Sequence, residues 1–567
     1  MLFRQIKAAV EVYHHLPRYR EIFRVFFKYG FVDMVRLVHL QKLLEIKESQ
    51  LPSRHGDLNH QPPAVRFRMA LEELGPTFVK FGQILSSRRD LINESFYQEL
   101  HKLQDQVPPF PGEEAKKIIE RELNHPIDEL FQEFDIHALA GASIAQVHQA
   151  VLLNGKVVAV KVQRPEITKV IEIDLAILAD VARFLDRHVE EISVLNPVGI
   201  VQEFAKTLSA ELDFTNEARN MERFAEQFRG NRTIRVPKLY NELTTERVLT
   251  MEFLKGYPVD QPNQLREHNI SPITLSERMS KLLFQQMFEF GFFHGDPHPG
   301  NITILLHGVA CLYDYGMMGI LSPTFREDIA TMILGLIEKD QRKVTRSLLG
   351  MSETGFADDL RKLESDVETF AEQYLDRPLK DLKLGFVLNR LLDVLMAHKL
   401  RMKSDFYLGV KALAQVEAIG EILNPDLNFV QFGEPYATQV IEKKYEFGTI
   451  FKNLIKSLAE SLDWLRDLPT DTREMYERIK SGRYKIPIEH RIDPKGFEPL
   501  RSSLNHIAHL LADAMLTSSI LICSSILILA GLPPKWHEMP VLGVAGLIFG
   551  GMMFLRLVLS IWKHGGL

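Results

Sequence analysis

The segment "HGDPHPGN", residues 294–301, gathers side chains that could do chemistry in a stretch too rich in proline and glycine for a helix or strand. It contains His294, Asp296 and Asn301 as H-x-D-x-x-x-x-N, a spacing used by phosphoryl-transfer enzymes of the kinase type. In such enzymes the aspartate orients or deprotonates the acceptor, and the asparagine binds a magnesium ion. The spacing predicts Asp296 as a catalytic residue and Asn301 as a metal ligand.

Asp314, in "YDYG", is the candidate for a second metal ligand. The intervening "ITILLHGVACLY" reads as two short strands around a His-Gly turn, which would bring Asn301 and Asp314 together. Their amide and carboxylate oxygens suit Mg²⁺. The alternative is a zinc-binding turn that uses His294 and His298, but outside a helix this spacing does not put both rings on one face, and no third ligand is evident.

Lys161, in "VVAVKV", has the V-A-x-K setting of the strand lysine that holds nucleotide phosphates. A lone lysine in a strand is more often a solvated edge residue. Apolar residues surround this one, so a buried Lys161 would need a partner. Glu217, in "ELDFTNEARN", is the candidate, and the spacing alone leaves both interpretations open.

The segment before Lys161 would cover the phosphates, although it lacks the glycines of G-x-G-x-x-G. Side chains restrict close approach of the backbone, so we expect nucleotide binding to differ from that of an ordinary protein kinase. The predicted nucleotide-binding residues, besides Lys161, are Leu139, Ala140, Gly141, Ala142, Ser143, Ile144, Ala145, Gln146 and Val147.

The elements that must position these residues follow from periodicity. Residues 1–110 read as helices, and residues 133–163 as strands joined by a turn at Asn154–Gly155. A helical stretch covers 166–228, and "IRVPKLY" and "RVLTMEFLKG" read as two more strands. Helical periodicity then dominates to about residue 480. This order predicts helices, a small sheet and a large helical half.

The segment after Asp314 argues against a peptide kinase. "MMGIL" leads directly to "SPTFRED", where Ser322 is a good N-cap and Pro323 suits the first helical position. No room remains for the long activation segment that seats a peptide, and the residue before Asp296 is not the usual arginine. ATP hydrolysis, or action on a small lipid-like molecule, is the better expectation.

Composition sets broad limits. A chain of 567 residues should hold more than one compact unit. Its net charge of −6 gives no overall basic field, so nucleic acid is not an expected partner. With Cys311 and Cys523 as the only cysteines, a disulfide framework and a cysteine metal cluster are excluded.

Two uncharged stretches, Ala514–Leu532 and Val541–Leu555, stand near the C-terminus. Each approaches the ~20 residues that cross a bilayer, and Gly546 and Gly550 form a G-x-x-x-G that would let two helices touch or permit membrane dimers. We therefore expect a transmembrane hairpin over 513–563. The alternatives are a buried hairpin in a soluble domain and a surface-lying helical pair. The N-terminus shows no secretory signal.

Taken together, ordered motifs over most of the chain resemble the UbiB/ADCK atypical kinase-like family, which is associated with ubiquinone biosynthesis. They are "FVKFGQ", "LAGASIAQVH", "VAVKVQRP", "ELDFTNEA", "HGDPHPGN" and "YDYG". The resemblance implies an α+β, protein-kinase-like bilobal fold with an N-terminal helical extension, to which we add the C-terminal two-helix transmembrane hairpin. The expected parts are 1–110 (extension with the K-x-G-Q motif), 111–255 (N-lobe with a helical insertion), 256–435 (helical C-lobe), 436–512 (membrane-proximal helices) and 513–563 (hairpin).

The resemblance also implies roles for individual residues. Lys80 and Gln83 of the K-x-G-Q helix would meet Glu211 and Asp213 above the nucleotide. The same resemblance pairs Lys161 with Glu217 and assigns catalysis and metal binding to Asp296, Asn301 and Asp314, with ATP and Mg²⁺ as cofactors. Two departures stand out: the loop reads A-G-A-S, which bears on the choice between ATP and ADP, and Tyr315 replaces the usual Phe.

The expected function is an ATP- and Mg²⁺-dependent ATPase or small-molecule or lipid kinase that supports ubiquinone biosynthesis. We expect it to be anchored in the bacterial inner membrane by its hairpin, with the kinase-like domain in the cytoplasm. Membrane lipids, isoprenoid quinone precursors and quinone-biosynthesis enzymes would be its partners. The alternative is a non-catalytic nucleotide switch that organises those enzymes or extracts lipid. A small-molecule phosphotransferase of the aminoglycoside or choline type would share the "HGDxHxxN" loop but not the K-x-G-Q helix.

Overall fold

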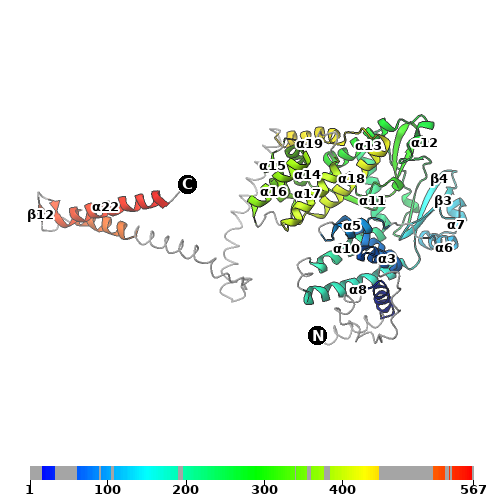
Figure 1. The fold of residues 1–567 in the computed structure, drawn as a ribbon, viewed down its shortest axis with the longest axis horizontal. Helices are drawn as coiled ribbons and strands as arrows, with labels where there is room; N and C mark the ends of the chain where they lie inside the picture. The colour runs from blue at the N-terminus through cyan, green and yellow to red at the C-terminus, as the bar shows by residue number, and fades with distance from the viewer. Residues whose placement is uncertain are drawn as a thin grey trace. The chain divides into compact units, whose positions relative to one another are not determined.

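The computed structural model describes residues 16–31, 61–88, 91–103, 108–189, 196–338, 340–353, 359–375, 383–445, 515–529, 535–536 and 539–564. The chain divides into two compact units, Met1–Ile455 and Lys456–Leu567, and each is described by itself. Within the first unit, the strands β3 and β4 lie beside the helices α6 and α7, and α13 to α19 gather into a helical half (Figure 1).

An antiparallel sheet carries the predicted hairpin. Its path is β1 (Phe131–Phe134), β3 (Ala145–Leu152), β4 (Val157–Gln163) and β6 (Val248–Glu252), and β2 (Ala140–Gly141) pairs with β3. The β3–β4 pairing runs from Ala145 opposite Gln163 to Val151 opposite Val157, which confirms the hairpin. Gly155 makes the turn with a φ of +77°, a conformation that glycine adopts without steric cost.

The strand β4 shows why the sheet positions Lys161. Successive side chains of a strand point to opposite faces. Val158 and Val160 pack with α6 (Gly112–Leu123) and α7 (Ile127–Leu130), whereas Ala159 packs in the core on the other face. That face is covered by α11 (Phe214–Gln227). The period of two therefore turns Lys161 toward α11.

Two smaller sheets hold the loops of the helical half. In the first, the order is β5 (Ile234–Arg235), β10 (Val309–Leu312), β9 (Ile302–Leu305) and β7 (Tyr257–Pro258). The second pairs β8 (Phe292–His294) with β11 (Met318–Ile320). The predicted β9–β10 hairpin is confirmed, and its turn uses His307 and Gly308 at φ values of +64° and +71°.

The helical half packs around one core. Its helices are α12 (Pro262–Glu267), α13 (Pro272–Phe284), α14 (Pro323–Glu338), α15 (Gln341–Met351), α16 (Leu360–Leu375), α17 (Leu384–Ala397), α18 (Ser404–Leu423) and α19 (Phe429–Tyr445). A π-helical turn, Gln285–Phe290, follows α13 and leads into β8. As predicted, α14 begins at Pro323, and the Ser322 Oγ accepts the Phe325 N–H at 3.2 Å.

The N-terminal helices form their own core. A helix over residues 16–28, α3 (Pro63–Leu74), α4 (Pro76–Ser87) and α5 (Glu94–Leu100) pack apolar side chains against α8 (Ile167–His188). The helix α10 (Pro197–Leu212) runs beside α8 and also contacts α4. These contacts place the K-x-G-Q helix, α4, against α3 and α5 as well as α8, α10 and α18.

The second unit corrects one prediction. A helix over 515–529 packs on α22 (Val541–His564), and a Cβ atom on Gly546 would lie 2.2 Å from the Ser524 Oγ, so the two helices do touch at this glycine. However, no described helix is both long and apolar enough to span a membrane. Residues 515–529 rise about 22 Å, against ~30 Å of hydrocarbon, and the uncharged run of α22 ends at Arg556. The predicted transmembrane hairpin is therefore wrong for the described residues. Most of the predicted membrane-proximal region, 446–512, lies outside them.

Candidate active site

Lys161 and Glu217 form a buried ion pair between β4 and α11. The Lys161 Nζ lies 2.8 Å and 3.1 Å from the two carboxylate oxygens of Glu217. The same Nζ lies 3.8 Å from the Asp314 Oδ1. One ammonium group thus faces two carboxylates, which is the setting a strand lysine needs if it is to leave water.

The pKa values in this cluster follow from burial and charge. Burial opposes the charged form of Lys161, but Glu217 and Asp314 outweigh burial and raise the pKa of its ammonium. Burial would raise the pKa of Asp314, yet Lys161 and the Gly316 N–H hold it well below its usual range. Burial raises the pKa of Glu217 to about 7. The charge of Lys161 opposes this rise in pKa, and the charge of Asp314 adds to it. Asp314 is therefore the firmly ionised carboxylate of the three-charge cluster.

Asp314 lies two residues after the end of β10, and hydrogen bonds connect its loop to the rest of the site. Its Oδ1 accepts the Gly316 N–H at 2.9 Å, and its backbone carbonyl contacts the Nε2 of His294. The next residue, Tyr315, donates its N–H to Glu217 at 3.3 Å. The carboxylate of Glu217 thus joins α11, β4 and the loop after β10.

Asp296 lies in the loop after β8, where His294 accepts its N–H at 3.1 Å. Its Oδ1 lies 3.0 Å from the Nζ of Lys411 and accepts the side-chain N–H of Gln415 at 2.6 Å. Burial would raise the pKa of Asp296, but Lys411 and Gln415 lower it below its ordinary value. Asp296 is therefore a mostly buried, ionised carboxylate.

Asn301 ends the 3₁₀ turn Pro299–Asn301, just before β9. Its side-chain N–H donates to the carbonyl of Asp296 at 3.4 Å, and its own carbonyl accepts the Tyr313 N–H at 3.2 Å. The β9–β10 ladder, with Ile302 opposite Leu312, thus keeps the backbone beside Asn301 near that of Asp314. The hairpin brings together these two segments, as the sequence predicted.

Lys80, on α4, pairs with Glu211, on α10. Their closest charged atoms are 2.6 Å apart, and Lys80 is 8% exposed. Lys80 also helps to lower the pKa of Asp314, so its charge acts on the metal-site candidate. Gln83 donates to the carbonyl of Leu103 at 3.3 Å. Asp213 caps α11 by accepting the N–H of Thr215 at 2.9 Å.

The predicted phosphate loop divides into two parts. Leu139 and Ala140 are exposed, whereas Ile144 and Ala145 lie in the apolar core. Gln146 is fully buried, accepts the Phe110 N–H at 2.9 Å and contacts the ring of His148. The Ser143 Oγ is buried without a hydrogen-bond partner among the described residues. Gly141 pairs with Gln146, Ala142 donates to the carbonyl of Ala145 at 2.8 Å, and Val147 is half-buried.

The donors present fit Mg²⁺ and do not fit zinc. Asp314 offers an ionised carboxylate and Asn301 an amide oxygen, and Mg²⁺ is usually held by one or two carboxylates together with substrate phosphates. Both ring nitrogens of His294 are engaged, Nδ1 by the Asp296 N–H and Nε2 by the Asp314 carbonyl, and the Nδ1 of His298 accepts the Gly300 N–H at 3.1 Å. Across the described ranges, no group of three His, Cys, Asp or Glu side chains could hold a metal ion.

Lys411 and Gln415 are site residues that sequence reasoning missed. They stand four residues apart on α18, so their side chains leave one face of the helix. That spacing was visible in "GVKALAQ". Nothing in the sequence linked this helix face to Asp296, because the contact depends on how α18 docks against the loop after β8.

Three family models match parts of this chain. Residues 102–348 match the ABC1 atypical kinase-like domain, 367–428 the UbiB helical domain, and 495–563 the ABC1/UbiB kinase-like C-terminal domain. A protein named "Probable protein kinase UbiB" from Marinobacter nauticus is 36% identical over 75% of this chain and 78% of its own length.

Two further matches are more distant. "Uncharacterized protein sll1770" from Synechocystis is 32% identical over 74% of this chain and 73% of its own. Among solved structures, the Rv3197–erythromycin complex from Mycobacterium tuberculosis shares 22% identity, with a TM-score of 0.45, over 62% of this chain and 90% of that one.

Proposed function

Because this chain belongs to the UbiB family of atypical kinase-like proteins, we propose that it is an ATP- and Mg²⁺-dependent enzyme supporting ubiquinone biosynthesis. It hydrolyses ATP or phosphorylates a small lipid-related molecule. The observation that carries the proposal is the ion pair of Lys161 and Glu217, in which the Lys161 Nζ also lies 3.8 Å from the Oδ1 of the ionised Asp314.

Each residue has a distinct task in this proposal. Lys161 binds nucleotide phosphates, and Glu217 fixes the lysine in place. Asp314 and Asn301 hold Mg²⁺, which when bound would neutralise charge on the phosphate oxygens. Asp296 orients the attacking hydroxyl or water and accepts its proton. Lys80 and Glu211 place a further charged pair beside Asp314.

A protein substrate fits this site poorly. Leu321 and Ser322 alone separate β11 from α14, so the chain has no peptide-seating segment there. On another side, α4 carries the half-buried and buried side chains of the K-x-G-Q motif. We therefore expect the acceptor beside Asp296 to be water or a small molecule and not a peptide.

The second candidate is a nucleotide switch without turnover, which organises other quinone-biosynthesis enzymes or extracts lipid. One observation favours it: the Oδ1 of Asp296 is already engaged by Lys411 and Gln415. In this state the carboxylate is satisfied without an acceptor hydroxyl, as expected of a protein that binds nucleotide and does not transfer phosphate.

The test measures ATP turnover of the purified full chain with and without Mg²⁺, membrane lipid and a quinone-precursor mimic. Asp296→Asn should lower turnover at least 100-fold and leave ATP affinity within about threefold, because the aspartate acts on the nucleophile and not on the nucleotide. Asp260→Asn, which alters an exposed aspartate, is the matched control and should change neither quantity.

Unchanged turnover in Asp296→Asn would remove the catalytic assignment. If the same variant has no turnover but still restores growth to a quinone-deficient strain, the switch is the better account. Loss of both turnover and rescue, with ATP affinity intact, supports the enzyme.

A further inference from the structure

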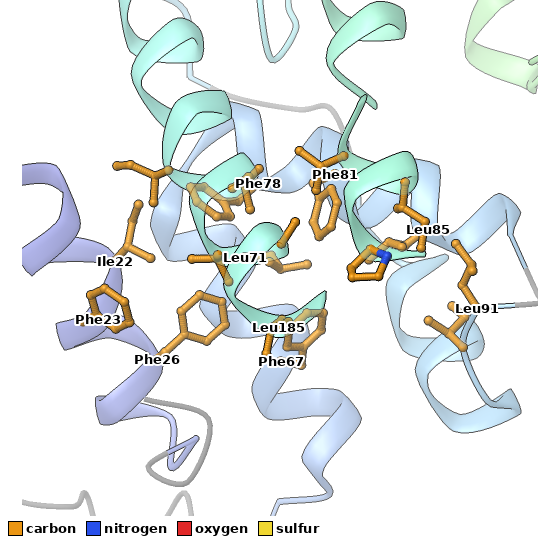
Figure 2. Close-up of a pocket in the computed structure, with 18 residues that line it drawn as sticks. Ile22, Phe23, Phe26, Phe67, Leu71, Phe78, Phe81, Leu85, Leu91 and Leu185 are labelled. Atoms are coloured by element: carbon orange, nitrogen blue, oxygen red, sulfur yellow. The ribbon is translucent and has the colours of Figure 1, made fainter. Parts of the chain in front are cut away.

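A cavity of about 300 Å³ lies between the N-terminal helices and the pair α8 and α10. Figure 2 shows side chains from the helix over 16–28 and from α3, α4 and α8 converging on this shared space. The cavity belongs to the first unit alone, and Lys161, Asp296 and Asp314 do not line it.

All the side chains that line the cavity are apolar. None of these side chains carries a hydrogen-bonding group, and each is buried or half-buried. Among them are Phe78, Phe81 and Leu85 from α4, Val181 from α8, and Ile200 and Val201 from α10. Water needs two to four polar partners to be stable inside a protein, so this space does not suit water.

The lining also selects the ligand. A polar molecule, or the backbone of a peptide, would lose its hydrogen bonds to water and find no replacement from these side chains. A hydrocarbon loses nothing of that kind and gains dispersion contacts with thirteen aliphatic side chains and five phenylalanine rings. The chemistry of the walls therefore favours an uncharged hydrocarbon.

The size of the cavity sets the length of the ligand. It is about twice the ~150 Å³ of an apolar cavity that binds benzene, and it falls at the lower end of small-molecule sites. On that scale it holds roughly a dozen carbon atoms. We propose that this cavity is a binding site for the hydrocarbon chain of a lipid-like molecule, either an isoprenoid or an acyl chain.

The cavity is separate from the proposed nucleotide site, but two helices, α4 and α10, contribute residues to both. The helix α4 faces the cavity with Phe78, Phe81 and Leu85 and carries Lys80 on another face. The helix α10 lines the cavity with Ile200 and Val201 and carries Glu211. The binding claim needs no turnover, so its test omits nucleotide and remains informative if the chain proves not to hydrolyse ATP.

The probes are farnesol for the isoprenoid chain and 1-dodecanol for the acyl chain, titrated into the purified full chain by calorimetry without nucleotide. Saturable binding of either probe at about one per chain supports the proposal. Selective binding of one identifies the chain type. If neither binds, the proposal is overturned, because other parts of the chain then fill the cavity or close it.

Variants locate the bound probe. Val181→Phe, on α8, and Ile200→Phe, on α10, each add a ring to the cavity from a different wall and should weaken binding at least tenfold. Val170→Phe, on the exposed part of α8, is the matched control and should bind like the unmodified chain. Full binding in a folded Val181→Phe or Ile200→Phe protein, as judged by its melting temperature, would place the probe elsewhere and overturn the assignment.

Discussion

The Nζ of Lys411 lies 3.0 Å from the Oδ1 of Asp296, so a helix of the C-terminal part supplies the cation that faces the proposed catalytic carboxylate. Gln415, one turn further along α18, donates to the same oxygen. The loop of Asp296 has no lysine of its own between residues 294 and 301. The position of α18 therefore controls the charge and the orientation of Asp296.

Replacing this lysine should change both the rate and its dependence on pH. Burial raises the pKa of Asp296 and Lys411 opposes that rise, so Lys411→Ala should raise this pKa and move the acidic limb of the kcat/KM profile to higher pH. At pH 7 we expect turnover to fall about tenfold because the carboxylate also loses its orientation. Steady-state ATPase rates from pH 4.5 to 8 measure both effects.

Lys411→Arg should recover part of the rate by keeping the charge. Lys362→Ala, at an exposed position on α16, is the control and should leave the profile unchanged. A drop in rate without any shift of the acidic limb would show that Lys411 is structural and does not tune Asp296.

The ion pair of Lys161 and Glu217 makes a prediction about stability. Lys161→Met would leave the buried carboxylate of Glu217 and the partly exposed carboxylate of Asp314 without their cation, and we expect a loss of about 3–5 kcal/mol in the free energy of unfolding. Lys161→Met combined with Glu217→Gln should recover part of that loss, since one uncompensated charge is removed. Denaturant unfolding of the single and double variants tests this, and an equal loss in both would contradict it.

Replacing Tyr315 with phenylalanine should stabilise the folded chain. Its ring is fully buried against Phe224, with centroids 5.3 Å apart, but its hydroxyl has no hydrogen-bond partner in the described part of the chain. Tyr315→Phe should therefore raise the free energy of unfolding by about 1–3 kcal/mol. Tyr19→Phe is the contrast, because the Tyr19 hydroxyl donates to Asp180 at 2.5 Å and its loss should destabilise. Thermal unfolding of both variants decides the point.

Glu417 should make stability depend on pH. It accepts the N–H groups of Leu384 and Gly385 at 2.6 Å and 2.8 Å, yet burial raises its pKa to about 7. A carboxyl whose pKa is higher in the folded chain favours folding when protonated. The protonated Glu417 makes its full contribution to the free energy of unfolding below about pH 4.5. That contribution is lost as pH rises through 7, which lowers the free energy of unfolding by about 3 kcal/mol.

Glu417→Gln stays neutral and should flatten the change in melting temperature between pH 5 and pH 8. Glu368→Gln, which alters an exposed glutamate on α16 that does not act on Glu417, should keep the slope of the unmodified chain. Glu217, whose pKa is also raised to about 7, will leave some slope in every variant. Identical slopes in the two glutamine variants would refute the assignment to Glu417.

Features of the site that depend on local patterns were predictable. The turn at Asn154–Gly155 and the alternation along β4 fix which face Lys161 takes, and the turn at His307–Gly308 brings Asn301 toward Asp314. These elements are specified by neighbouring residues, through turn geometry and a period of two. Periodicity can therefore recover them from one sequence.

Features that depend on docking were not predictable. Lys411 meets Asp296 only because α18 packs against the loop after β8, and no local signal carries that information. Gln146 was expected at the nucleotide, but its side chain ties β3 to Phe110. The apolar composition near the C-terminus predicts a transmembrane hairpin, but composition alone does not give the length of the uncharged helices.

The helix α4 has no solvent-facing side. Each of its described side chains is buried or half-buried, from Thr77 and Phe78 to Ser86, and Gly82 leaves no room for a Cβ beside Leu103 and Leu71. A helix that is enclosed all round has no position at which substitution is free. Saturation mutagenesis should therefore find α4 less tolerant of substitution along its whole length than α16, which alternates exposed and buried positions. In such an experiment, α4 should accept as few substitutions as the residues of the active site do.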